Sequence, residues 1–365
     1  MKGVLAGVVA GLIASAAVVR IAACFHHAHV HTRLVAEDAS APLKRVAIHY
    51  APSADPVALG VWRQLFAVLP ASVEVEVEVA QRGDFDQLIG KLRGIPNLER
   101  MHPVVVGAPI TTWSRDRYAA LADDRGDGEI LAPPRIEAAF VDRAGDARSA
   151  HAISEAIYDR DAITANIVFE GGDLAATPRF VFADVNLAAR NLGRARADRP
   201  TIESELHRRF AQELIWLGDT LGDVPRHHIM MYMVPLDDHT VAVGDIRAGV
   251  ALLADDALVL DDVALQARRF DRAAELLAAR GFHVVRVPVL VLAGGGSFVT
   301  YTNALFDRRG DQRIVYLPTY AQPALDDAGQ KFYESQGFEV HRIDVSPIYR
   351  LNGSLGCLVN VLMRG

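Results

Sequence analysis

Short apolar segments with strand-like patterns alternate with single helix-like segments from Lys44 to the end of the 365-residue chain. This alternation has no linker inside it, so it predicts one continuous α/β body. Hydrophobic residues make up 51% of the chain and charged residues 23%, which is typical of a globular protein and excludes a disordered one. The recurring order of strand, strand, helix and strand is compatible with a structural repeat, although the letters themselves do not repeat.

Hydrophobic periodicity gives the positions of the expected elements. The expected strands cover residues 45–50, 73–79, 102–106, 118–121, 129–131, 166–169, 229–235, 240–243, 284–292, 301–306, 313–317 and 339–343. The expected helices cover residues 56–69, 84–92, 150–158, 201–217, 263–280 and 323–336. Valine and glutamate alternate strictly over residues 73–79, so we expect one buried and one solvated face for that strand.

Residues 1–43 differ in character from the rest, and we expect them to lie outside a folded body that spans residues 44–365. Lys2 precedes an uncharged apolar run over residues 3–19, a pattern typical of an export signal or a membrane anchor. The histidine-rich tract at residues 26–31 could bind a metal, but no carboxylate or cysteine completes a ligand set, which favours a flexible linker.

Two forms of attachment to the cell envelope fit this segment. Residues 21–24 (Ile-Ala-Ala-Cys) resemble a bacterial lipoprotein box, in which Cys24 is lipidated, although Arg20 places a charge just before the box. The alternative is an uncleaved helix over residues 3–25, which is long enough to span a bilayer. In both cases we expect an exported protein with a membrane tether at its N-terminus.

Charge and cysteine content limit the partners. The formal net charge is −7, from 45 acidic and 38 basic residues, and no basic stripe interleaved with aromatic residues occurs. We therefore expect no nucleic-acid partner. The two cysteines, Cys24 and Cys357, lie too far apart for zinc-ligand spacing, and we expect neither a metal nor a cofactor.

The chemically informative residues lie in four stretches. Cys357 is flanked by glycine in an apolar stretch near the C-terminus, where a lone cysteine is more often a small buried hydrophobe. A cysteine thiolate attacks electrophilic carbon well, but the thiol needs a neighbouring cation or base to ionise. His228 is the one side chain in these stretches suited to proton transfer near neutral pH, although taken alone it could be a core histidine.

Two carboxylates and a tryptophan complete the set. Asp116 and Glu170 each follow an expected strand into a turn, where a side chain can project into a shared cleft. A guanidinium group presents five donors in a planar fork, so paired carboxylates are its natural partners. The structural alternatives are a surface ion pair for Asp116, an ordinary turn for Glu170 and simple packing for Trp113.

The four stretches, in this order, resemble the guanidino-group-modifying enzymes, or penteins, and within them the agmatine deiminase branch. Residues 113–116 (Trp-Ser-Arg-Asp) are similar to its Trp-x-Arg-Asp motif, and residues 170–172 to its Glu-Gly-Gly motif. Residues 301–303 (Tyr-Thr-Asn) and 353–357 (Gly-Ser-Leu-Gly-Cys) are similar to further stretches of that branch. The resemblance implies five ββαβ units that form a propeller around a central channel holding the site.

The resemblance also implies roles for individual residues. Cys357 would be the nucleophile, His228 the general acid and base, and Glu170 the partner of the histidine and of the guanidino group. Asp116 would bind the guanidino nitrogens, and Trp113 would form a wall of the substrate site. The expected partner is therefore a small cationic guanidino or amidino compound, hydrolysed at a C–N bond through a covalent thiouronium.

Two positions depart from the family pattern. The family has His-x-Asp, with the aspartate completing the guanidinium clamp, whereas this chain has Met230 two residues after His228. Losing that carboxylate removes a charge-assisted pair worth about 1.5–3 kcal/mol. Gly356 stands where the agmatine branch has histidine, at a position that varies more widely. The leading interpretation is a cysteine hydrolase of linear amidines. The alternative is a degenerate pentein that binds a ligand or partner without turnover, and a purely structural envelope protein is less favoured.

Overall fold

The computed structural model describes residues 32–365 except residues 97, 124–126, 135–144, 193–196 and 254–257. The expected export or anchor segment, Cys24 and the histidine tract lie outside the described residues. In the part that is described, no helix combines the length and the apolar character needed to cross a bilayer.

Within the described residues the strands form five separate sheets. In sheet order these are β18 (Val359–Arg364), β2 (Leu43–Tyr50), β3 (Glu74–Val79) and β4 (Met101–Val105); β1 (Arg33–Leu34), β5 (Ala119–Ala122), β6 (Gly128–Ala132) and β7 (Ile163–Thr164); β10 (Glu213–Leu217), β9 (Phe180–Asp184) and β8 (Ala175–Ala176); β11 (Met233–Pro235), β12 (Thr240–Asp245), β13 (His283–Val291) and β14 (Phe298–Thr300); and β15 (Leu305–Arg309), β16 (Gln312–Thr319) and β17 (Phe338–Asp344).

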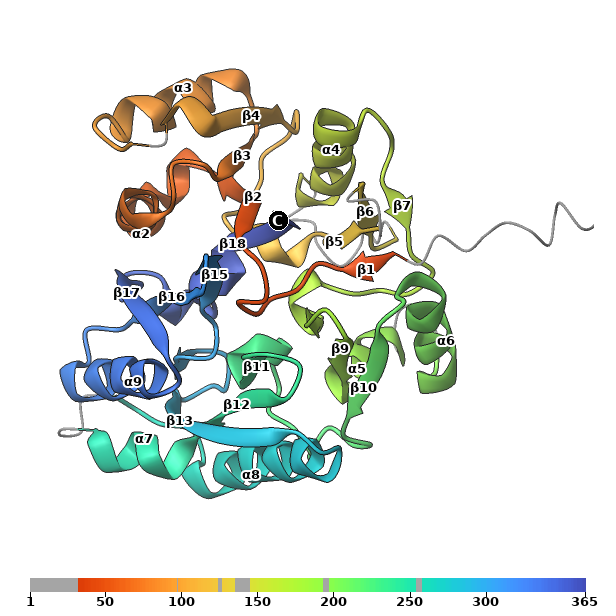
Figure 1. The fold of residues 1–365 in the computed structure, drawn as a ribbon, viewed down its shortest axis with the longest axis vertical. Coiled ribbons are helices and arrows are strands. Elements are labelled where there is room, and N and C mark those ends of the chain that lie inside the picture. Colours follow the sequence, from red (N-terminus) through yellow and green to blue (C-terminus); the bar gives the residue numbers. More distant parts are fainter. Residues whose placement is uncertain (1–31, 97, 124–126, 135–144, 193–196, 254–257) are drawn as a thin grey trace, which may run out of the picture. The chain divides into compact units, whose positions relative to one another are not determined.

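Helices connect the strands of each sheet (Figure 1). They are α2 (Asp55–Val68), α3 (Arg82–Lys91), α4 (Asp146–Tyr158), α5 (Val185–Leu192), α6 (Arg199–Arg209), α7 (Ile246–Leu252), α8 (Val263–Ala279), α9 (Pro323–Ser335) and α10 (Leu355–Leu358). Helix α8 shows why they form. The Asp262 side chain caps its first turn by accepting from Leu265 N, and its buried residues recur at helical spacing. Burying Phe270 and Leu277 contributes about 1.5–3 kcal/mol each.

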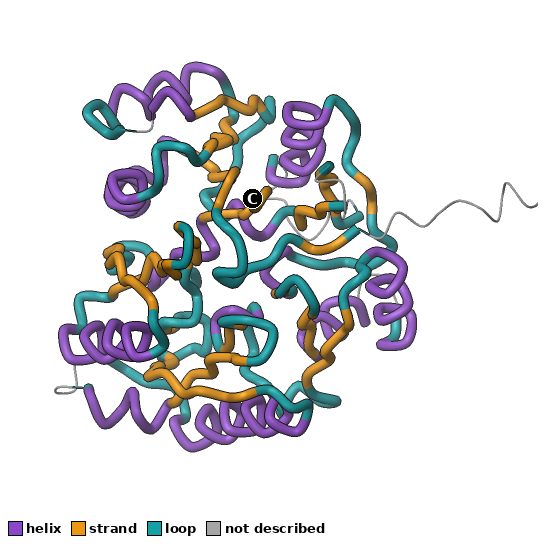
Figure 2. The backbone as a smooth tube through the Cα atoms, viewed as in Figure 1, coloured by secondary structure: helices purple, strands orange, loops and turns teal. Residues whose placement is uncertain are grey.

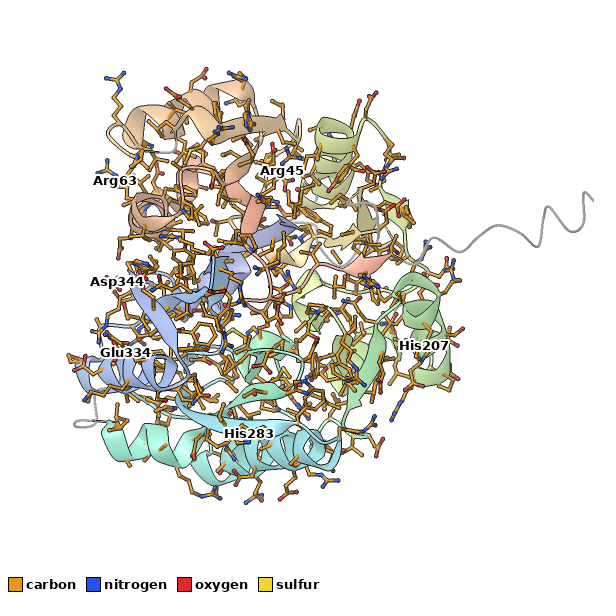
Figure 3. All side chains as sticks on the ribbon, in the orientation of Figure 1. Arg45, Arg63, His207, His283, Glu334 and Asp344 are labelled. Carbon is orange, nitrogen blue, oxygen red and sulfur yellow. The ribbon has the colours of Figure 1, made fainter. Side chains whose placement is uncertain are left out.

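The same connection recurs in all five sheets. An antiparallel strand pair is followed by one or two helices and then by a strand parallel to the second strand of the pair, as in β5, β6, α4 and β7. The first sheet is completed by β18, the last strand of the chain, which pairs antiparallel with β2. The expected alternation of strands and helices is therefore present, although two helices and not one precede β10 and β13. Figure 2 shows helices beside each group of strands. Charged side chains such as Arg63, His207 and Glu334 are exposed at the periphery (Figure 3).

The start of the folded body differs from our expectation. The folded unit begins at Thr32 and not at Lys44. Residues 33–34 form β1, which pairs with β5, and Leu34, Val35 and Ala39 are buried. The expected boundary at residue 44 is therefore wrong. Polar residues alternate with the apolar ones before residue 44, so the sequence pattern did not indicate that this segment packs against the core.

Several expected elements are wrong in whole or in part. The expected strands over residues 229–235 and 301–306 begin only at Met233 and Leu305. The expected helix over residues 201–217 is helix α6 followed by strand β10, because the apolar run Leu214–Leu217 pairs in parallel with β9. The expected strand over residues 166–169 is not a strand, although its residues 167–169 are buried. Glu170 is therefore delivered by an irregular buried segment.

Strand β3 is buried on both faces, contrary to the expected solvated one. Glu76 and Glu78 are 5% and 0% exposed. Tyr118 Oη donates to Glu78 Oε1 at 2.7 Å, and His49 Nε2 lies 3.4 Å from the same oxygen. The alternation of glutamate and valine marks a strand correctly, but partners from other segments cover the acidic face.

Candidate active site

Four short turns carry the residues singled out in the sequence. Asp116 ends the 3₁₀ turn Ser114–Asp116, Glu170 precedes the turn Gly171–Asp173, His228 precedes the turn Ile229–Met231, and Cys357 lies in α10. The Asp116 turn packs against both α10 and the Gly171–Asp173 turn, which in turn packs against the Ile229–Met231 turn. The structure therefore brings together side chains that span most of the chain.

His228 is at the centre of this cluster. Its Nε2 lies 2.8 Å from Glu170 Oε2, and its Nδ1 lies 4.0 Å from Asp116 Oδ1. Burial disfavours the imidazolium, but the interaction with Cys357 and the carboxylates of Glu170 and Asp116 outweigh it and raise the pKa of His228 well above its usual value. These interactions therefore favour a protonated imidazole in the cluster.

Cys357 is buried, with 4% of its surface exposed, and is a free thiol. Its Sγ lies 3.6 Å from Asn303 Nδ2 and 3.7 Å from Asn303 Oδ1. Interaction with Cys357 is one of the causes that raise the pKa of His228. A buried cysteine with an amide on its sulfur, in a cluster that also holds a histidine, is the arrangement expected of a nucleophile.

Close packing explains why two glycines follow Glu170. A Cβ on Gly172 would lie 2.5 Å from His228 Nδ1, and a Cβ on Gly171 would lie 2.2 Å from the carbonyl oxygen of Arg115. Both contacts are closer than real Cβ atoms allow. The Gly-Gly pair therefore lets the backbone approach the histidine ring and the Asp116 turn, in addition to turning the chain.

Two arginines that our sequence analysis did not assign surround Glu170. Arg190 Nη2 lies 2.9 Å from Glu170 Oε2, and Arg190 Nε lies 2.8 Å from Asp173 Oδ2. Arg117 Nη2 approaches Glu170 Oε1 at 4.0 Å. Burial would raise the pKa of Glu170, but the hydrogen bond from His228 and the charges of His228, Arg190 and Arg117 lower it. Arg190 lies on α5, a short helix that our sequence analysis left unassigned.

The neighbouring His227 has a different role from His228. Its Nδ1 accepts a hydrogen bond from His228 N at 2.7 Å, and its ring packs edge-on against Phe298. Burial and the positive charge of His228 lower the pKa of His227 to about 3, so its ring is neutral at physiological pH. The histidine available for proton transfer is therefore His228.

The last two predicted residues, Trp113 and Met230, lie in segments next to the cluster. Trp113 is half-buried, and its ring packs against Gly353, where an added Cβ would lie 2.2 Å from the ring. Met230 is buried, and its carbonyl oxygen accepts from Thr302 Oγ1 at 2.8 Å. No group of three or more His, Cys, Asp or Glu side chains suited to a metal occurs among the residues that the structure describes.

Comparison with known proteins was made by sequence and by structure. No family model matches the chain, and no curated protein matches it significantly. Among solved structures, a substrate-bound agmatine deiminase of C. jejuni has 16% identity and a TM-score of 0.67, over 92% of this chain and 97% of that one. An agmatine deiminase of Enterococcus faecalis has 14% identity and a TM-score of 0.66, over 91% and 96% of the two chains.

The chain has the fold of these agmatine deiminases. The resemblance that the sequence predicted is therefore confirmed at the level of the fold. At such low identities the likeness establishes the fold of the pentein body and leaves its reaction to be argued from the site residues.

The buried pair of His228 and Glu170 makes stability depend on pH. The raised pKa of His228 contributes stability that is complete below its ordinary value of about 6.5 and is lost as pH rises through the raised value. The lowered pKa of Glu170 contributes stability that is present above about 4.5 and is lost as pH falls through the lowered value.

We expect His228→Gln to reduce the free energy of unfolding more near pH 6 than near pH 10. Urea denaturation at the two pH values measures this, with the exposed His207→Gln as control. An equal loss at both pH values would contradict the charged pair.

Proposed function

We propose that this pentein is a cysteine hydrolase of a guanidino or amidino C–N bond. The observation that carries the proposal is the cluster in which the His228 imidazole lies 2.8 Å from Glu170 Oε2 and 4.0 Å from Asp116 Oδ1, while the Asp116 turn packs against the helix that carries Cys357. The thiol, the imidazole and the carboxylate form the arrangement of a nucleophile, a proton carrier and a residue that orients it. The agmatine deiminases with which the chain shares its fold support the substrate class.

The proposed reaction has two halves. The Cys357 thiolate attacks the central carbon of the guanidinium and forms a tetrahedral adduct. His228 donates a proton to the departing nitrogen through Nδ1, since Nε2 is engaged by Glu170, and ammonia or an amine leaves a covalent thiouronium. Neutral His228 then removes a proton from water, which attacks the same carbon, and the C–S bond breaks to release a urea. The sum is one guanidinium and one water converted to one urea and one ammonium; an amidinium would give the corresponding amide in place of the urea.

Asp116 is the proposed anchor for the substrate nitrogens. It is 6% exposed and lies 4.0 Å from the histidine nitrogen that faces the reacting group. Glu170 already receives His228 and Arg190 on Oε2, so it contributes mainly to the orientation of the histidine. Trp113 acts by packing on Gly353, four residues before the nucleophile, and thereby supports the turn that carries Cys357.

A second candidate is a pentein that binds a ligand without turnover. The observation that favours it is Met230, a buried thioether where the family has a carboxylate, together with the Arg190 guanidinium that already pairs with Glu170 and Asp173. Both features reduce the negative charge that the site can offer to a cationic ligand. The two candidates differ in one measurable quantity, the release of ammonia.

The test is incubation of the full chain with a panel of alkyl-substituted guanidines, amidines and agmatine, with ammonia and the urea product both measured. Ammonia released in equal amount to the urea supports the hydrolase. Ligand binding in calorimetry with no product from any compound would favour the non-catalytic alternative.

Met230 makes a prediction about the preferred substrate. A guanidino N–H that faces this side chain loses water without a new partner, at a cost of about 1–3 kcal/mol. We therefore expect Met230→Asp to raise kcat/KM for agmatine by about tenfold or more relative to the unmodified chain. Met230→Leu, which keeps the apolar character, is the matched control. Efficient turnover of agmatine by the unmodified chain, with no gain in the aspartate variant, would mean that residues 228–230 do not align with the family's His-x-Asp.

The finer architecture and the location of the protein are also proposals. We propose that the five sheets, each with the same ββαβ connection, are the blades of a propeller around the site. We propose as well that the N-terminal segment exports the protein and tethers it to the envelope through Cys24 or through residues 3–25. Loss of radiolabelled palmitate from a Cys24→Ala variant would support lipidation, and membrane fractionation distinguishes the uncleaved helix.

A further inference from the structure

The side-chain amide of Asn303 contacts the sulfur of Cys357. Its Nδ2 and Oδ1 lie 3.6 and 3.7 Å from Sγ, and the residue is 2% exposed. Within the described residues, Sγ is the only hydrogen-bond partner of this amide. Buried polar groups are normally hydrogen-bonded, and both polar atoms of this amide face one sulfur. We therefore expect the amide to influence whether that sulfur is a thiol or a thiolate.

The backbone around Asn303 is held from several sides. Gly356 N donates to the carbonyl oxygen of Asn303 at 3.2 Å, which ties it to the turn that carries the cysteine. Thr302 Oγ1 donates to Met230 O at 2.8 Å, which ties it to the turn that follows His228. Tyr333 Oη donates to Tyr301 O at 2.7 Å. The amide is therefore fixed relative to both Cys357 and the histidine turn and is not free to rotate towards solvent.

The Asn303 amide can occupy its position beside the sulfur because residue 356 is a glycine. A Cβ on Gly356 would lie 2.9 Å from Asn303 Oδ1 and 3.3 Å from its Cγ. A substituted residue 356 would have to push the amide away from the sulfur. The glycine and the asparagine therefore form a matched pair in this chain.

We propose that Asn303 is a positioning residue that stabilises the thiolate of Cys357 and aims it at the substrate. In the thiolate state Nδ2–H donates to Sγ, and in the thiol state Sγ–H donates to Oδ1, so one amide serves both states by a small rotation. A hydrogen bond to the charged form favours that form, and a neutral amide supplies it without a charge that titrates. Asn303 and His228 act on the sulfur together, and Asn303 does so at any pH. The inference rests on the proposed role of Cys357 as nucleophile.

The test measures the thiolate directly and needs no substrate. The rate of alkylation of Cys357 by iodoacetamide is measured against pH on the full chain, and peptide mass spectrometry separates its adduct from that of Cys24. Removing a hydrogen bond to a charged atom corresponds to a shift of about 1–2 pH units. We expect the pH midpoint of alkylation to rise by that amount in Asn303→Ala. In Asn303→Asp, which places a carboxylate of the same size beside the sulfur, we expect it to rise further.

Two more variants separate this role from simple packing. Gly356→Ala keeps Asn303 but displaces its amide, so we expect a similar upward shift, and the double variant Gly356→Ala with Asn303→Ala should shift no further than either alone. Asn191→Ala removes another fully buried amide, one that bonds the backbone of Val168 and Leu187 and does not touch the sulfur. This control should lower the stability and leave the alkylation midpoint in place.

Each outcome decides the inference independently of the proposed reaction. A midpoint that moves in the Asn303 and Gly356 variants supports the inference even if no compound of the panel is hydrolysed. A midpoint that stays within about 0.3 pH units of the unmodified chain in both Asn303→Ala and Asn303→Asp overturns it, even if the enzyme releases ammonia.

Discussion

Replacing Cys357 with serine is expected to reduce turnover of any active substrate by at least about a thousandfold, because the hydroxyl of serine is far less acidic than a thiol. His228 and Glu170 would keep their 2.8 Å contact, so the proton carrier remains while the nucleophile is lost. The replacement keeps the shape of a side chain that is 4% exposed, and the free energy of unfolding should change by about 1 kcal/mol or less. Steady-state kinetics and urea denaturation of the two proteins measure both quantities.

The covalent intermediate gives this prediction a second readout. Quenching the unmodified chain during turnover should leave an adduct on the Cys357 peptide with the mass of the substrate less ammonia or the departing amine. The serine variant should carry no adduct and still bind substrate. If the variant releases ammonia at an undiminished rate, Cys357 is not the nucleophile. If neither protein turns over but both bind the ligand equally well, the non-catalytic alternative is favoured.

The parts of the site that the sequence predicted are those that resemble the motifs of a known family. Cys357, His228, Glu170 and Asp116 were predicted because their stretches occur in the order of the agmatine deiminase branch, and the structure brings these stretches together. Arg190 was missed because an arginine on a short helix has no local signal for its pairing with Glu170. Ion pairs between segments distant in the chain are visible only once the chain is folded.

The errors in the fold have a similar physical origin. Leu214–Leu217 (Leu-Ile-Trp-Leu) is a short apolar run that cannot be assigned to a helix or a strand by periodicity alone, and pairing in parallel with β9 makes it a strand. Glu78 was assigned to a solvated face because its neighbours alternate, but Tyr118 and His49 from other segments bury it. In both cases the local pattern identifies an apolar or alternating segment, and tertiary contacts decide what it becomes.

The boundary of the body has consequences for the neighbourhood of the site. Glu37, which lies in the segment first expected to be linker, forms an ion pair with Arg115, and both side chains are almost fully buried. Arg115 directly precedes Asp116 in the same turn. The segment after Thr32 therefore supports the turn that presents the proposed substrate anchor, besides adding a strand to the second sheet.

A chain that begins at Thr32 is expected to unfold as cooperatively as the full chain, whereas one that begins at Lys44 should lose about 3 kcal/mol or more of stability. The carbonyl oxygens of Ala36 and Ala41 accept from Arg364 Nε at 2.6 Å and Nη1 at 2.8 Å, and Arg364 is partly buried. Hydrogen bonds to a charged group contribute about 1.5–3 kcal/mol each, and deleting residues 32–43 removes both of these acceptors along with β1. Urea denaturation of the two truncated proteins measures the difference. Arg364→Met in the longer protein reports how much of the loss comes from the guanidinium, which would keep its bond to Phe306 O at 3.1 Å after the deletion. Equal stability of the two truncations would show that residues 32–43 are a covering segment and not part of the core.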